Sequence, residues 1–367
     1  MLLSTTLRAP GRSLIGEIAP VVSVAPRGRV WLIRALALAA TAVFALLLAA
    51  HSGQMVRTVD RALHAGWQFV IIAVALEAAS IAGYVLLLHR VVAGAHPRLR
   101  LKDSYDMTLG GAAATRLLPT AGLGGAAVTV WALRARGVRA SELAERLLAF
   151  LLLLYGVYIS VLLVGGTAVG LGLVRVSEGR ALGLLGAAVA MAVAVTFLIL
   201  FAVPGPVARA LKLVGRRSRR LGSASRSVGA QLPVLRASFE RSRHELRRPH
   251  PALIGAVVYW IFDVGVLVTM LHAFGARMPL LAVVLAYFLG TMLNVVPLPG
   301  SLSGGLAGAS IALGAPAGAA IAAVLAYRAV AVWLPALPGI GSLASLRTSV
   351  ASWRMGTSMQ GDASVSQ

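Results

Sequence analysis

Apolar residues occur along this chain in long runs that contain no charged side chain or only one. Six runs have the length of a single membrane crossing, and they cover residues 35–56, 67–88, 147–174, 181–203, 251–274 and 317–346. A transmembrane helix needs about 20 mostly apolar residues, so each run predicts one full span.

Two further apolar segments, 104–133 and 279–315, are interrupted by proline and glycine. The apolar stretches beside each interruption hold roughly 12 to 18 residues, too few for a span. Proline cannot continue a helix, so each segment predicts a re-entrant hairpin of two half-helices. Its irregular backbone needs a protein-lined or water-filled cavity. The predicted tips contain Pro119, Gly122, Gly124 and Gly125 in the first hairpin, and Pro297, Pro299, Gly300, Gly304 and Gly305 in the second.

The order helix, helix, hairpin, helix occurs twice, in residues 31–174 and again in 175–346. Each copy has an odd number of full spans, so the second copy is expected to lie upside down relative to the first. The predicted fold class is therefore an all-α polytopic membrane protein with an inverted repeat. Residues 1–30 are expected to form a disordered cytoplasmic arm and residues 347–367 a disordered C-terminal tail.

The charge distribution predicts the orientation. The chain is 58% hydrophobic and 13% charged, with a net charge of +22. Nucleic-acid binding would require a basic face on a soluble fold, whereas these arginines lie between apolar runs, so we expect no nucleic-acid partner. With the N-terminus inside, 27 of the 34 basic residues fall in cytoplasmic segments and five in outer ones. The positive-inside rule then places both termini in the cytoplasm.

Four ionisable residues lie at membrane depth, where a charge is costly and usually functional: Glu77, Arg116, Asp263 and Arg328. The two arginines could hold a lipid phosphate, while the carboxylates hold a second charge or a proton. Alternatively, Glu77 with Arg116 and Asp263 with Arg328 form buried pairs that only fix helix register. Three polar residues of the second hairpin and the last helix complete the predicted substrate site: Asn294, Ser310 and Tyr327.

Other chemistry finds no support in the sequence. Cysteine is absent, the histidines lack metal-ligand spacing, and neither a nucleophile elbow nor a P-loop motif occurs. We therefore expect no metal, no cofactor and no enzymatic activity. The loop 204–250 carries twelve basic residues, which either bind anionic phospholipid headgroups or serve only as a topology signal.

The segment "PLPGSLSGGLAGASIALGAPAGAAIAAVLAYRAVAVWLP" resembles the signature of the flippase-like family that includes the transmembrane region of lysylphosphatidylglycerol synthase. Tyr327, Arg328, Trp333 and Pro335 match its last part, and "LLPTAGLGG" and "AERLLAFLLLL" also look like the family. Two features depart from it. Residues 301–303 are inserted within the Pro-Gly-Gly pattern, and Ser310 stands where the family has glutamate.

The resemblance implies movement of a polar-headed lipid between leaflets of a bacterial cytoplasmic membrane. The cargo would be an anionic or aminoacylated phospholipid or a polyisoprenyl-linked sugar. The family's soluble aminoacyl-transferase domain is not in this sequence, so we expect no aminoacyl transfer by this chain alone. The alternative is a membrane scaffold that docks a glycosyltransferase or lipid synthase through the loop 204–250. An intramembrane enzyme is a third hypothesis, and homo-oligomers are compatible with all three.

Overall fold

The computed structural model describes residues 66–93, 99–117, 124–173, 179–202, 251–295 and 300–365, with a few isolated positions between them. All regular elements in these ranges are helices. The predicted arm 1–30, the predicted span 35–56 and nearly all of the loop 204–250 lie outside the described residues.

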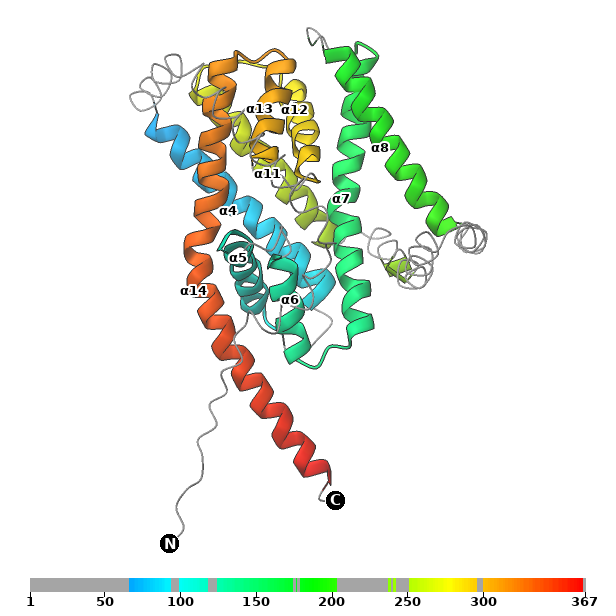
Figure 1. The fold of residues 1–367 in the computed structure, drawn as a ribbon, viewed down its shortest axis with the longest axis vertical. Helices are drawn as coiled ribbons and strands as arrows, with labels where there is room; N and C mark the ends of the chain where they lie inside the picture. Colours follow the sequence, from blue (N-terminus) through cyan, green and yellow to red (C-terminus); the bar gives the residue numbers. More distant parts are fainter. Residues whose placement is uncertain are drawn as a thin grey trace, which may run out of the picture.

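Five of the described helices are long and apolar enough to cross a membrane. They are α4 (Trp67–Leu88), α7 (Ala140–Gly170), α8 (Gly179–Ala202), α11 (Pro251–Ala273) and α14 (Ala317–Val365), and Figure 1 shows their arrangement. The bounds of α4 match the predicted span, and those of α11 differ by one residue. The chain is thus an all-α, multi-pass membrane protein.

Four short helices form two pairs. The first pair is α5 (Leu101–Leu117) with α6 (Gly124–Ala135), and the second is α12 (Leu280–Met292) with α13 (Ser301–Ala312). In Figure 1 the second pair lies beside the first turns of α14, whereas α5 and α6 lie farther along it. Both interruptions, with Pro119, Gly122, Pro297 and Pro299, lie outside the described residues.

Glycines bring the two helices of each pair into backbone contact. A Cβ added at Gly124 would lie 2.6 Å from the Thr115 nitrogen, and one at Gly290 would lie 2.6 Å from the Leu306 Cα. Thr115 Oγ1 also accepts a hydrogen bond of 2.8 Å from the Gly125 amide. Neither pair could be this close with larger residues at these positions.

The helices α4 and α11 pack antiparallel. Ser80 Oγ donates to the Tyr259 carbonyl at 3.1 Å. Three residues later on α4, a Cβ at Gly83 would lie 2.8 Å from the Gly255 carbonyl, four residues earlier on α11. Because residue numbers rise along α4 as they fall along α11, the two helices run antiparallel where they cross at these glycines.

Two helices are longer than the sequence indicates. The predicted span 147–174 corresponds to α7, which begins earlier, at Ala140. The first turns of α7 contain charged residues, including an i,i+4 pair of Glu142 with Arg146. The tail 347–367, expected to be disordered, is helical as far as Val365. Part of this extension is anchored: the Arg136 guanidinium lies 3.8 Å from the centre of the Trp353 ring. A search for charge-free runs detects only the apolar part of such helices.

Candidate functional site

A buried carboxylate, Asp263, lies where α11, α12 and α14 meet. Its Oδ1 accepts a hydrogen bond of 3.0 Å from the Tyr327 hydroxyl, and its Oδ2 accepts one from the Tyr287 hydroxyl. Only 6% of Asp263 is exposed, and both tyrosines are buried. The helices α11, α12 and α14 are therefore joined by one polar cluster inside an apolar core.

Aromatic rings enclose this cluster on the side of α7. Trp260 Nε1 donates to the Leu154 carbonyl at 2.8 Å, and the Tyr158 hydroxyl donates to the Phe288 carbonyl. The rings of Tyr158, Trp260 and Phe288 touch one another edge to face or tilted, with centroids 4.8 to 5.5 Å apart. Their polar atoms are bonded, so the cluster has a fixed wall.

Another buried carboxylate, Glu77, lies at the same level of the antiparallel pair as Asp263. Ser80 on α4 is opposite Tyr259 on α11, and a Cβ added at Gly265 would lie 3.4 Å from the Leu76 side chain. Glu77 is 6% exposed. The fold thus brings together two carboxylates from helices that lie about 180 residues apart in sequence. At a rise of 1.5 Å per residue, each carboxylate lies about 15–18 Å along its helix from the first helical residue.

Arg328 follows Tyr327 in α14 and is partly exposed. Its charge interacts electrostatically with the Asp263 carboxylate. Among the described residues, however, the ion pairs do not include one between Arg328 and Asp263. The two tyrosine hydroxyls take the place of the predicted Asp263–Arg328 pair. Arg328 lies about 16 Å along the helix from Ala317, near the middle of a bilayer-length segment.

Several other predicted residues lie in or beside the short helices α12 and α13. Ser310 is fully buried and donates to the Leu306 carbonyl at 2.7 Å, within its own helix. Asn294 is exposed in a short 3₁₀ turn after α12. Gly300 precedes α13 with φ of 80°, and Gly304 has open space beside it, whereas Gly305 is buried against Gly290. None of these contacts joins them to Asp263.

In the pair α5 and α6, Gly124 and Gly125 form the helix contact described above. Arg116 is the last residue but one of α5, and the position of its side chain lies outside the described residues. The alternative pair of Glu77 with Arg116 therefore stays a prediction.

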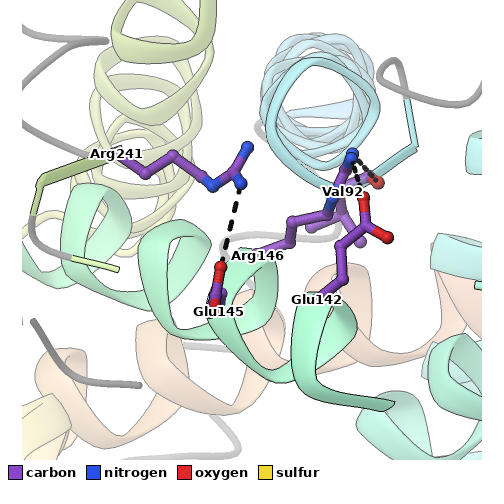
Figure 2. Close-up of polar contacts among 5 residues, drawn as sticks. All are labelled: Val92, Glu142, Glu145, Arg146 and Arg241. Atoms are coloured by element: carbon purple, nitrogen blue, oxygen red, sulfur yellow. Dashed lines mark hydrogen bonds and ion pairs between the residues drawn. The ribbon is translucent and has the colours of Figure 1, made fainter. Parts of the chain in front are cut away.

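A second polar cluster lies at one end of the long helices (Figure 2). Arg146, 7% exposed, donates from Nη1 to the Val92 carbonyl at 3.2 Å and from Nη2 to Glu142 at 2.5 Å. Val92 belongs to a π-helical turn, His89–Ala93, that continues α4. Nearby, Arg241 lies 3.9 Å from Glu145. Arg146 therefore fixes the end of α4 on α7.

A groove of about 420 Å³ opens between α4 and α5. Its lining is mostly apolar and includes none of the predicted site residues. The lining residues are Ala78, Ile81, Ala82, Val85, Leu86, Leu101, Lys102 and Tyr105. No cluster of three or more potential metal-ligating side chains occurs in the described part of the chain.

Sequence reasoning did not find Tyr287, Tyr158, Trp260 or Ser80. Tyrosine and tryptophan are ordinary members of an apolar helix, and a hydrogen bond across 24 or more residues leaves no local signal. A buried acid does imply donors nearby, and this could have directed attention to the tyrosine hydroxyls of neighbouring spans.

The long apolar helices, the paired short helices and the buried charges define a polytopic membrane protein with a polar cluster inside its apolar core. Residues 29–339 match the family model described as "Lysylphosphatidylglycerol synthase TM region". The chain belongs to this family, as the resemblance indicated. Neither a curated protein nor a solved structure matches the chain.

Proposed function

We propose that this protein moves a polar-headed anionic or aminoacylated lipid between the leaflets of a bacterial cytoplasmic membrane, as a transporter and not as an enzyme. The observation that carries the proposal is Arg328, a partly exposed arginine near the middle of an apolar helix, to which no carboxylate of the described residues is bonded. A charge at that depth needs polar surroundings. A lipid phosphate passing through a hydrated cavity would supply them, since a guanidinium binds two phosphate oxygens at once.

The proposed architecture is an inverted repeat whose hairpins enter from opposite sides, with both termini cytoplasmic. The antiparallel packing of α4 and α11 supports it, because equivalent helices of inverted repeats run in opposite directions. The two short-helix pairs also lie beside different parts of α14 in Figure 1. Substrate sites of such transporters lie near the midplane between repeats.

Cysteine labelling tests this architecture, because the chain contains no native cysteine. Ser301→Cys at the start of α13 should react with an impermeant maleimide added outside. Ala126→Cys, an exposed position on α6, is the matched control and should react only from the cytoplasmic side. Labelling of Ser301→Cys from the cytoplasmic side alone would contradict the inverted arrangement.

Transport is tested in proteoliposomes that contain a trace of fluorescent phosphatidylglycerol, with a reductant that quenches the outer leaflet. The wild type should move the label faster than protein-free vesicles. A charged hydrogen bond contributes about 1.5–3 kcal/mol, so Arg328→Ala should slow movement by about 10- to 100-fold. Arg277→Ala, an exposed arginine between α11 and α12, is the control and should behave as wild type. Equal rates for Arg328→Ala and wild type would refute the proposal.

A further inference from the structure

Asp263 differs from an ordinary buried carboxylate in the partners it has. Both oxygens are bonded to neutral hydroxyl groups, those of Tyr287 and Tyr327, and neither to a cation. A buried carboxylate usually pairs with a positive side chain, because burial of an unpaired charge costs several kcal/mol. Here the hydroxyl donors offset only part of that cost.

The charged and titratable groups around Asp263 come from four helices. α4 contributes Glu77, α11 itself contributes Tyr259, α12 contributes Tyr287, and α14 contributes Tyr327 and Arg328. On the side of α7, Tyr158 contacts the ring of Trp260, and its hydroxyl donates to the Phe288 carbonyl and not to Asp263. Arg328 is the one cation of the described residues that acts on Asp263, and it does so without a hydrogen bond.

Tyrosine hydroxyls suit a carboxyl group in either protonation state. When Asp263 is ionised, both hydroxyls donate to it, as observed. When it is protonated, its own O–H can donate to one hydroxyl oxygen, and that tyrosine turns its proton away. An arginine could not serve in this way, because it has no acceptor. The cluster therefore accommodates a proton without rearrangement of its heavy atoms.

We propose that Asp263 is a proton-binding site and that lipid movement is coupled to it. The coupling rests on the proposed function. A proton from water on one side bonds to a carboxylate oxygen, and the same O–H bond breaks when the proton leaves to water on the other side. The charge on Asp263 controls Arg328: the carboxylate attracts the guanidinium, and the neutral acid releases it to hold an anionic headgroup. One proton and one anionic lipid then move together without net charge.

A pH gradient across proteoliposomes tests the coupling. With one proton per lipid, one pH unit across the membrane should shift the leaflet ratio of a trace of labelled phosphatidylglycerol by up to about tenfold. Asp263→Asn keeps the shape of the side chain, and the leaflet ratio in this variant should not depend on the pH gradient. A wild type that moves lipid with no response to the gradient, or an Asp263→Asn variant with the wild-type response, would overturn the coupling.

Infrared spectroscopy tests the proton site whether or not lipid moves. A carboxylic-acid C=O band that titrates with pH should occur in the wild type and in Glu77→Gln, and should be missing in Asp263→Asn. Its midpoint should shift in Tyr287→Phe and Tyr327→Phe, which keep the rings and remove the hydroxyls. If the wild type moves no lipid, the proposed function and the coupling fail together. The absence of a band that depends on Asp263, or a midpoint unchanged in both phenylalanine variants, overturns the proton site itself.

Discussion

The crossing of α4 and α11 gives a prediction that the geometry makes quantitative. A Cβ at Gly255 would lie 2.7 Å from the Gly83 carbonyl oxygen and 2.8 Å from the Leu87 nitrogen, both backbone atoms. These atoms cannot rotate away, so Gly255→Ala must push the two helices apart. The pair carries the buried carboxylates Glu77 and Asp263, so the displacement would reach the candidate site.

The expected cost has two opposing parts. Overpacking in a well-packed interior destabilises by about 1–3 kcal/mol. Alanine favours a helix over glycine by about 1 kcal/mol, which acts in the opposite direction. Gly156→Ala on α7 is the matched control, because a Cβ there has nothing within 4 Å and only the second part applies. Gly255→Ala should therefore be less stable than Gly156→Ala by about 1–3 kcal/mol.

The assay is reversible unfolding in detergent, followed by the midpoint of a denaturant titration. Gly83→Ala should be destabilised as well, because its Cβ would lie 2.7 Å from the Tyr259 nitrogen. One separation of the helices relieves both clashes, so the double variant should lose less than the sum of the single losses. Equal stability of Gly255→Ala and Gly156→Ala would refute the close approach.

Three further predictions concern single contacts. Gly300→Ala should cost about 1–2 kcal/mol, because φ of 80° is left-handed, whereas Gly304→Ala, with open space beside it, should not destabilise; unfolding midpoints compare the two. Trp260→Phe should lose about 1 kcal/mol with its hydrogen bond to Leu154, and an unchanged midpoint would contradict the contact. Arg146→Met should cost about 1–3 kcal/mol and speed amide exchange in the π-helical turn, since Val92 and Glu142 lose a donor; unchanged exchange there would contradict that role.

The sequence predicts much of the helical layout, because the length of an apolar run is a physical requirement of the bilayer. The bounds of α4 and the two pairs of short helices beside the Pro/Gly interruptions follow from this rule. The ends of α7 and α14 do not, because the charged residues there interrupt the apolar run.

The candidate site could be predicted only in part. The rarity of charge at membrane depth singles out Glu77, Asp263 and Arg328. In the structure, the two acids lie at the same level of the antiparallel pair α4 and α11. The partners of Asp263 could not be found in the same way. Tyr287 and Tyr327 reach it from two other helices, and the packing that brings them there depends on contacts such as Gly290 with Leu306, which lie far from Asp263 in sequence.

The dependence of transport on headgroup charge tests the central claim most directly. The rates of labelled phosphatidylglycerol and labelled phosphatidylcholine are measured in the same proteoliposomes, with wild type, Arg328→Ala and Arg328→Lys. A guanidinium that holds the phosphate of an anionic lipid predicts faster movement of phosphatidylglycerol in the wild type, partial loss of that preference in Arg328→Lys, and complete loss in Arg328→Ala. A preference that persists unchanged in Arg328→Ala would contradict the account.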